Sequence, residues 1–176
     1  MSGEPHLPPP THARPVTLRP ATGSDRDFLL AVYSASREEE LAPVPWSDEQ
    51  KAAFLAQQFA AQDRDYRQRH PAGRFLIVEV GGEPAGRLYV AVLPGDGLPD
   101  ELRILDIALL APFRNAGTGS ALLADVIAEA DRDGRRVSLH VERWNRARRL
   151  YERLGFAVVA ETDVYLLLER PLASAS

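Results

Sequence analysis

The sequence predicts an α/β fold of the α+β kind, built on one mixed sheet. Residues 101–123 run from an apolar segment through a glycine-containing loop into a segment whose apolar residues have helical spacing. Three consecutive strands are predicted between Phe75 and Leu109, whereas a doubly wound nucleotide-binding fold would alternate strands and helices from its start. Two further strands, at residues 156–161 and 164–169, close the chain. The expected order is strand, helix, helix, three strands, helix, strand, helix and two strands.

The first two elements follow from short patterns. Alternating side chains at residues 16–19 predict a strand. Ser24 and Asp27 have the spacing of a capping box, so we expect the first helix to begin there and to run to about Glu40.

A second helix and a hairpin come next. Ser47 and Gln50 form another capping-box pattern, and the amphipathic segment that follows ends before Pro71. Strands are predicted at residues 75–80 and 86–93, and the Gly81-Gly82 pair between them indicates an antiparallel hairpin.

The segment after this hairpin predicts an anion-binding site. Residues 102–110 are almost continuously apolar, as in a strand covered on both faces, and Pro112 ends them. The loop at residues 114–119 holds two glycines at the start of a helix that ends at Asp133-Gly134. The backbone N–H groups of the loop and the positive end of the helix dipole are therefore directed toward the same point, which is where an anion would bind.

This loop departs from two known nucleotide-binding patterns. A Walker-type phosphate loop requires a lysine, and the sequence has Gly119-Ser120-Ala121 instead. A dinucleotide fingerprint requires a small residue where Leu122 stands, although Glu142, after the next strand, is placed to imitate the ribose-binding acid. The dinucleotide interpretation stays open on these residues.

Composition limits the classes of function. The 176 residues suit one domain, expected at residues 15–170 between tails at 1–14 and 171–176. The formal charge of −4 gives no general attraction to nucleic acid or to an anionic membrane. The absence of cysteine excludes disulfides and thiol nucleophiles, and we expect no metal. No signal peptide or run of about 18 apolar residues is seen, so we expect a cytoplasmic protein.

Two motifs together resemble one family. The pattern Arg-x-x-Gly-x-Gly, at residues 114–119, resembles the pyrophosphate-binding loop of the GNAT superfamily of acyl-CoA N-acyltransferases. Residues 137–156 predict a strand and a helix closed by glycine, and they contain Asn-x-Ala followed by Leu-Tyr-x-x-x-Gly-Phe, which is similar to the later motif of that superfamily. This second motif is carried by Asn145, Ala147, Leu150, Tyr151, Gly155 and Phe156.

The resemblance implies a GNAT-like fold over about residues 15–170, with helices on both faces of the sheet. It implies an N-acetyltransferase that moves an acetyl group from acetyl-CoA, its cosubstrate, to a primary amine by direct attack in a ternary complex. A non-catalytic acyl-CoA-binding or regulatory domain is the alternative. The expected partner is a small-molecule or peptide amine, and a homodimer is possible.

The resemblance also implies where acetyl-CoA binds. Its pyrophosphate would lie on the N–H groups of residues 115–120, and its thioester carbonyl near the N–H of Leu109, where family members splay the central strand from the next one. The implied cofactor-binding residues are Ile107, Leu109, Arg114, Asn115, Ala116, Gly117, Thr118, Gly119, Ser120 and Asn145.

Acid–base candidates come from the same comparison. Tyr151 matches the family tyrosine that donates a proton to the departing thiolate, although a tyrosine on an apolar helix face also suits a core position. Glu101 and Asp106, on the central strand, and Glu142, at the end of the next strand, are candidates for the base that deprotonates the amine, with relay through water as the alternative. Acids and aromatic rings suit a cationic amine. The residues expected in the acceptor pocket are therefore Tyr33, the acidic run Glu38-Glu39-Glu40, Trp46, Tyr66, Tyr89 and Glu142.

Overall fold

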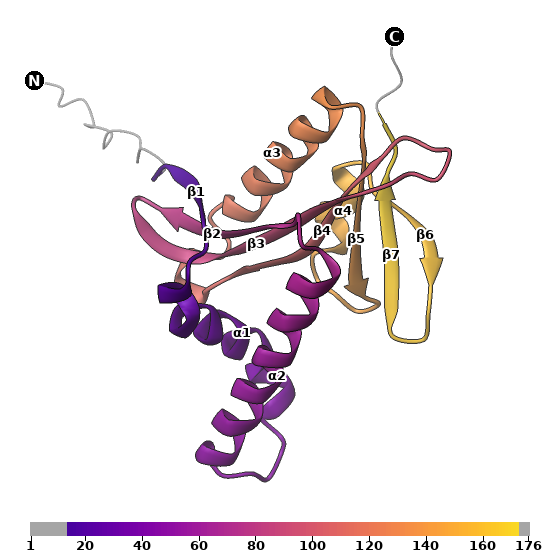
Figure 1. The fold of residues 1–176 in the computed structure, drawn as a ribbon. Helices are drawn as coiled ribbons and strands as arrows, with labels where there is room; N and C mark the ends of the chain where they lie inside the picture. Colours follow the sequence, from indigo (N-terminus) through magenta and orange to yellow (C-terminus); the bar gives the residue numbers. More distant parts are fainter. Residues whose placement is uncertain (1–13, 173–176) are drawn as a thin grey trace, which may run out of the picture.

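The computed structural model describes residues 14–172 and contains one seven-stranded mixed sheet (Figure 1). The strand order is β1-β2-β3-β4-β5-β7-β6, and only β4 and β5 pair in parallel. The strands are β1 (Val16–Pro20), β2 (Arg74–Val80), β3 (Glu83–Leu93), β4 (Glu101–Leu109), β5 (Arg136–Glu142), β6 (Ala157–Glu161) and β7 (Tyr165–Arg170). The α-helices are α1 (Arg26–Leu41), α2 (Asp48–Arg69), α3 (Thr118–Arg132) and α4 (Arg148–Arg153).

The predicted order of strands and α-helices is confirmed, and two short 3-10 turns, at residues 23–25 and 111–113, are added to it. The first strand begins at Val16 and the last ends at Arg170. Residues 1–13 and 173–176, which make up most of the two predicted tails, lie outside the described residues.

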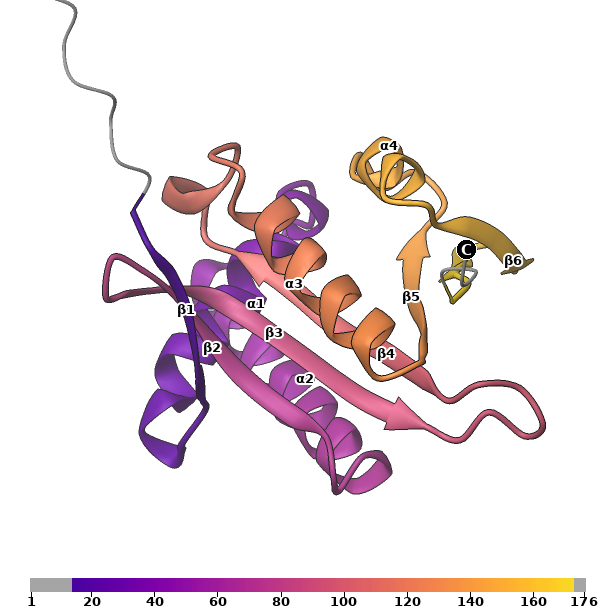
Figure 2. The same cartoon turned by 90° about the horizontal axis from the view of Figure 1, so that it is seen from above.

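Helices cover both faces of the sheet (Figures 1 and 2). On one face α3 packs over the α3-side core, which includes Leu122, Leu123 and Val126 and also takes Tyr151 from α4. On the other face lies the α1/α2-side core, formed by the buried side chains Leu29, Tyr33, Phe59, Ile77 and Tyr89.

Local signals account for most element ends. The capping box predicted at the start of α2 is confirmed, since Ser47 Oγ accepts from the N–H of Gln50 at 3.2 Å and the amide of Gln50 accepts from Ser47 N–H at 2.9 Å. The box predicted at Ser24 is wrong by two residues. Thr22 is the residue that pairs with a side chain three positions on, because its N–H donates to the Asp25 carboxylate at 2.8 Å.

The hairpin between β2 and β3 also forms as predicted. Its two turn residues, Gly81 and Gly82, have φ of +61° and +81°, the left-handed region that a two-residue hairpin turn requires. The strand β3 begins three residues earlier than predicted, because Glu83 pairs with Val80 directly after the turn.

Strands β4 and β5 are paired over only four residues each. The pairs run from Glu101↔Arg136 to Ile104↔Leu139, and beyond them the two strands continue to Leu109 and Glu142 without pairing to each other. Figure 2 shows the strands diverging from this point. The parallel sheet is therefore open at the carboxyl ends of its two central strands.

A β-bulge lies just where the strands separate. Tyr89 pairs with Asp106 while Val90 pairs with Ile104, so Leu105 is an extra residue on β4. Leu105 packs against the α1/α2-side core, whereas Ile107 and Leu109 pack against the α3-side core. Side chains alternate between the two faces along a strand, and the extra residue shifts this alternation by one. Even-numbered residues face the α3-side core before the bulge, and odd-numbered residues face it after the bulge.

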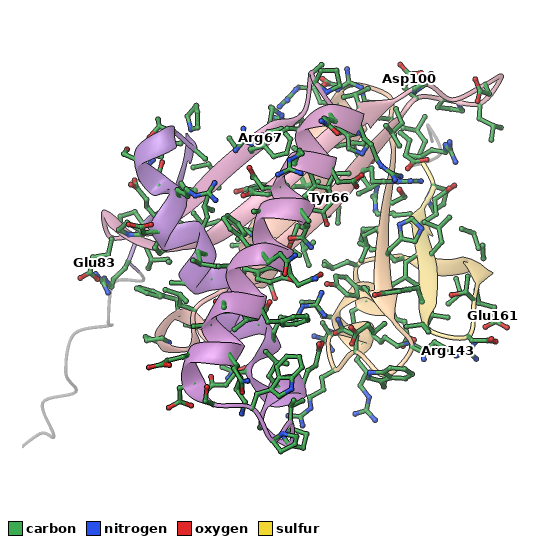
Figure 3. All side chains as sticks on the ribbon, turned by 60° about the horizontal axis from the view of Figure 1, so that its bottom comes forward. Tyr66, Arg67, Glu83, Asp100, Arg143 and Glu161 are labelled. Atoms are coloured by element: carbon green, nitrogen blue, oxygen red, sulfur yellow. The ribbon has the colours of Figure 1, made fainter. Side chains whose placement is uncertain are left out.

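The hydroxyl of Tyr66 on α2 holds this bulge. It donates to the carbonyl oxygen of Leu105 at 3.1 Å, and Figure 3 shows Tyr66 on α2. Burial raises the pKa of Tyr66 to about 12, so the hydroxyl keeps its proton and remains a donor at neutral pH.

Replacing Tyr66 by phenylalanine is expected to lower the free energy of unfolding by about 1–3 kcal/mol, because the bulge carbonyl loses its donor. Tyr89→Phe is the matched control. The Tyr89 hydroxyl is buried and has no hydrogen-bond partner among residues 14–172, so its removal should be neutral or stabilising. Urea unfolding of both variants tests the pair; equal losses of stability would show that the Tyr66 bond does not hold the bulge.

Candidate active site

Two cavities meet at the place where β4 and β5 separate. The larger, of about 660 Å³, lies along the loop after β4, the start of α3 and the segment before α4. The smaller, of about 460 Å³, is enclosed by α1, α2, the diverging ends of β4 and β5, and β7. Four residues line both cavities: Ser36, Ile107, Asn145 and Tyr151.

The larger cavity contains a set of free backbone donors. Among residues 14–172, no acceptor takes a hydrogen bond from the backbone N–H groups of residues 115–120. Asn115 and Gly117 have φ of +59° and +81°, and Gly117 is the residue from which α3 begins. Successive N–H groups in such a turn, together with the start of a 15-residue helix, form a concave site for an anion.

Space in this loop fits a ligand that approaches the backbone closely. A Cβ built on Gly119 would meet no protein atom within 4 Å, and Gly119 lies in ordinary helical backbone. Neither packing nor backbone conformation within the protein therefore requires a glycine at this position. The close approach of a phosphate group to the backbone would explain the glycine, because a side chain there would reduce the space for the phosphate.

Most of the predicted cofactor-binding residues line the larger cavity, and two do not. Ala116 is absent from its lining and Thr118 is buried beneath the loop. The others lie around the cavity: Ile107, Leu109, Arg114, Asn115, Gly117, Gly119, Ser120 and Asn145.

The end of β4 presents a backbone donor to the gap. Leu110 N–H bonds to Ala85 O on the β3 side at 2.8 Å, and residues along an antiparallel strand alternate in the direction of their backbone groups. The N–H and C=O of Leu109 therefore point away from β3. The carbonyl is taken by the guanidinium of Arg114, whose Nε donates to it at 2.7 Å. The N–H of Leu109 faces the opening between β4 and β5.

Asn145 caps a turn that precedes α4. Its side-chain oxygen accepts from Ala147 N–H at 2.8 Å, and α4 begins only at Arg148. Residues 142–147 form this turn, with Asn145 N–H bonded to Glu142 O at 3.0 Å. This turn puts Asn145 beside both cavities.

Tyr151 lies at the junction of the two cavities. Its ring is 5% exposed and packs edge-on against Phe156, with the ring centres 6.0 Å apart. Burial, and secondly the charge of Asp106, raise the pKa of Tyr151 above its ordinary value of about 10. The phenol is therefore protonated at neutral pH and able to donate a proton.

Asp106 faces the smaller cavity from β4. Its carboxylate accepts a hydrogen bond from the buried guanidinium of Arg87, which also donates to the amide of Gln62 at 3.1 Å. Burial raises the pKa of Asp106 and the Arg87 charge opposes this rise. Asp106 thus combines access to the cavity with a stronger affinity for protons than an exposed aspartate has.

Glu101 is not brought to the site. It stands five residues before Asp106, about 17 Å along a strand, and lines neither cavity. Its carboxylate accepts from Arg103 Nε at 2.7 Å and from the Ser138 hydroxyl. This hydrogen-bonded group lies at the paired end of β4 and β5, where the strands have not yet separated.

Some of the predicted acceptor residues reach the smaller cavity. Those that line it are Tyr33, Glu40, Tyr66 and Glu142, whereas Glu38 and Glu39 do not. Trp46 lies in the connection between α1 and α2, is 41% exposed and packs against Phe54. Tyr89 is fully buried beneath the cavity and is not part of its lining.

Several lining residues escaped the sequence analysis. They are Ser36 and Arg37 of α1, Gln62 of α2, Arg87 of β3 and Tyr165 of β7. Of these only Arg87 carried a local signal, since it is a charged residue inside an otherwise apolar strand. Arg146 is the one arginine of residues 143–153 that lines the larger cavity.

The part of the chain that the structure describes includes no helix long and apolar enough to cross a membrane. Within the same residues, no group of three or more histidine, aspartate or glutamate side chains is arranged to hold a metal ion.

The sequence matches the model of the "Acetyltransferase (GNAT) family" over residues 30–156. A search of curated protein sequences found no match. Solved structures with a similar fold include the PaiA N-acetyltransferase of Thermoplasma acidophilum in complex with coenzyme A. That structure is 16% identical in sequence, has a TM-score of 0.68, and the alignment covers 89% of this chain and 99% of that one.

Two more structures extend the comparison. An acetyltransferase from Thermus thermophilus is 19% identical with a TM-score of 0.66, over 92% of this chain and 100% of that one. Naa50 of Arabidopsis thaliana, in complex with the bisubstrate analogue CoA-Ac-MVNAL, is 18% identical with a TM-score of 0.57, over 89% of this chain and 99% of that one.

Proposed function

Because the chain belongs to the acetyltransferase (GNAT) family, we propose that it transfers an acetyl group from acetyl-CoA to a primary amine by direct attack in a ternary complex. The observation that carries the proposal is the junction of two cavities at Tyr151 and Ile107, one with free backbone donors and one with a carboxylate. Similar structures that contain coenzyme A or its conjugates support acetyl-CoA as the donor.

The larger cavity is the proposed donor site. The N–H groups of residues 115–120 would hold the pyrophosphate, and Arg146, at the rim, would supply a positive charge to a further phosphate. The N–H of Leu109 would bind the thioester carbonyl and stabilise the oxyanion that forms on attack. Each of these contacts uses a donor that the protein itself leaves free or exposed.

The smaller cavity is the proposed acceptor site. Asp106 would accept the proton that an ammonium group must lose before its nitrogen attacks. Tyr151 would donate its proton to the departing thiolate. The nitrogen thus loses one proton to Asp106 before it attacks and a second proton as the C–S bond breaks and the amide forms. Tyr151 gives its proton to the coenzyme A thiolate, and the second amine proton restores the phenol through solvent, so that the acetyl group passes directly from sulfur to nitrogen and one proton is released overall.

Binding and turnover test this function in sequence. Acetyl-CoA at about 100 times its dissociation constant should stabilise the protein by about 2.7 kcal/mol, which for this size raises the Tm by roughly 5–11 °C. Free coenzyme A should act similarly, whereas NADH and ATP should not. Stabilisation by NADH without a response to coenzyme A would contradict the proposal.

Release of thiol from acetyl-CoA is then measured across a set of primary amines. Amine-dependent release shows catalysis, and its loss in Asp106→Asn, with acetyl-CoA affinity kept, would assign the base. Binding of acetyl-CoA without release for any amine would instead indicate the non-catalytic acyl-CoA-binding domain.

A further inference from the structure

The acceptor cavity has one carboxylate that the protein does not neutralise. Arg37 Nη1 contacts both carboxylate oxygens of Glu40 at 3.0 Å, and Arg87 is paired with Asp106. The side chain of Glu142 makes no ion pair and no hydrogen bond within residues 14–172. The cavity lining thus contains two guanidinium groups and three carboxylates, and the carboxylate of Glu142 is the one without a cationic partner.

Neighbouring cations do not supply the missing partner. Arg143, the next residue along the chain, turns to the edge of the sheet, where it donates to Thr162 O at 2.9 Å and lies 3.4 Å from Glu161 (Figure 3). His140 is another residue of β5 that lines the cavity. Burial and the charge of Arg103 lower its pKa, so its imidazole is neutral at pH 7 and does not pair with Glu142 as a cation. The charge of Glu142 thus remains available to a ligand.

An aromatic ring completes this corner of the cavity. Tyr165 on β7 is paired with Glu142 on β5, and both line the cavity. The face of Tyr33, by contrast, already carries the guanidinium of Arg37, 5.6 Å from the ring centre. A carboxylate beside an available tyrosine ring is an arrangement that binds a cation.

The two cavity carboxylates that flank the opening lie on different strands. Asp106 is two residues beyond the last β4–β5 pair on β4, and Glu142 is three residues beyond it on β5. Because Leu139 and Val141 point into the α3-side core, Glu142 projects from the same face of the sheet as Asp106. The separation of the strands therefore places the two acids on opposite walls of one cavity.

We propose that the acceptor is a primary amine that carries a second cationic group, chemically a diamine or a longer polyamine. Its reacting nitrogen would face Asp106 and Tyr151, and its second, charged nitrogen would bind Glu142 beside Tyr165. This inference rests on the proposed acetyl transfer and specifies its substrate class.

Three amines of similar length separate the possible end groups: 1,4-diaminobutane ends in a cation, n-pentylamine in a methyl group and 4-aminobutanoate in a carboxylate. The diamine should have a kcat/KM about 10-fold or more above that of pentylamine, because it gains a charge-assisted contact. This exceeds the factor of about two that two equivalent amines supply statistically. The carboxylate should be the poorest acceptor.

Charge variants test the residue. In Glu142→Gln the ratio of diamine to pentylamine kcat/KM should fall toward the statistical value, and in Glu142→Lys the carboxylate should become the better of the two charged acceptors. Glu152→Gln is the matched control, since this exposed α4 residue lines neither cavity and loses the same charge. Intrinsic differences between the amines cancel when ratios are compared between variants.

Three outcomes would overturn the inference. They are pentylamine or 4-aminobutanoate reacting as well as the diamine with the wild-type protein, an unchanged ratio in Glu142→Gln, or an equal loss in Glu152→Gln. In each of these cases acetyl transfer still takes place, so the proposed function would stand. The absence of transfer to every amine would reject both.

Discussion

Replacing Tyr151 by phenylalanine is expected to lower kcat by about 10²–10⁴, the usual contribution of a positioned acid, while acetyl-CoA affinity changes little. Tyr151 lines both cavities, and its ring packs against Phe156. Phenylalanine keeps this packing and removes only the proton donor. Single-turnover measurement of the acetyl-transfer step, beside calorimetric binding of acetyl-CoA, separates the two effects.

The dependence of kcat on pH gives a second check. Burial raises the pKa of Tyr151, so the protonated phenol persists beyond the ordinary value of about 10. Activity that depends on this proton should therefore fall only at more alkaline pH, and the fall should be absent in Tyr151→Phe.

Tyr89→Phe is the control for the loss of a tyrosine hydroxyl. Tyr89 is buried in the same part of the protein and lines neither cavity, so this variant should keep its turnover. A kcat in Tyr151→Phe equal to that of Tyr89→Phe would remove Tyr151 from the mechanism and leave protonation of the thiolate to water.

Replacing Gly119 by glutamate is expected to weaken acetyl-CoA binding by about 100-fold or more, equivalent to about 2.7 kcal/mol. The new carboxylate would lie at the start of α3 and compete with the pyrophosphate for the N–H groups of residues 115–120. A Cβ at this position meets no protein atom within 4 Å, so the fold should tolerate the change.

Gly119→Ala is the matched control. Alanine restricts the unfolded chain and favours a helix by up to about 1 kcal/mol over glycine, so this variant should be more stable than the wild type. It adds one methyl group without charge, so its affinity for acetyl-CoA should fall much less than that of Gly119→Glu. Titration calorimetry on the three proteins measures the difference, and wild-type affinity in Gly119→Glu would place the pyrophosphate elsewhere.

Features that depend on nearby residues were predictable from the sequence. The cap of α2 at Ser47 needs only a partner three residues on, and the Gly81-Gly82 turn needs only two residues that adopt positive φ. The anion-binding loop is similarly local, because its donors and the helix that follows come from one continuous segment, residues 114–132. Eight of the ten residues predicted to bind the cofactor line the larger cavity.

The smaller cavity depends on contacts between distant segments. Glu101 and Asp106 lie on one strand and are equal candidates from the sequence, but of these two only Asp106 lies beyond the point where β4 and β5 separate. The bulge at Leu105, held by Tyr66 of α2, decides which face the end of β4 presents. No pattern within residues 101–109 determines the position of that bulge.

The sequence by itself therefore determined the order of the elements, the loop with free backbone N–H groups and the position of Tyr151 after it, because each rests on interactions within a short segment. Only the tertiary structure decided which carboxylates line the smaller cavity. Arg37, Arg87 and Tyr165 come from α1, β3 and β7, and they meet Asp106 and Glu142 only through strand register and helix packing. Pairing between segments far apart in the chain neutralises Asp106 and leaves Glu142 free, and a charge balance of that kind does not exist until the chain has folded.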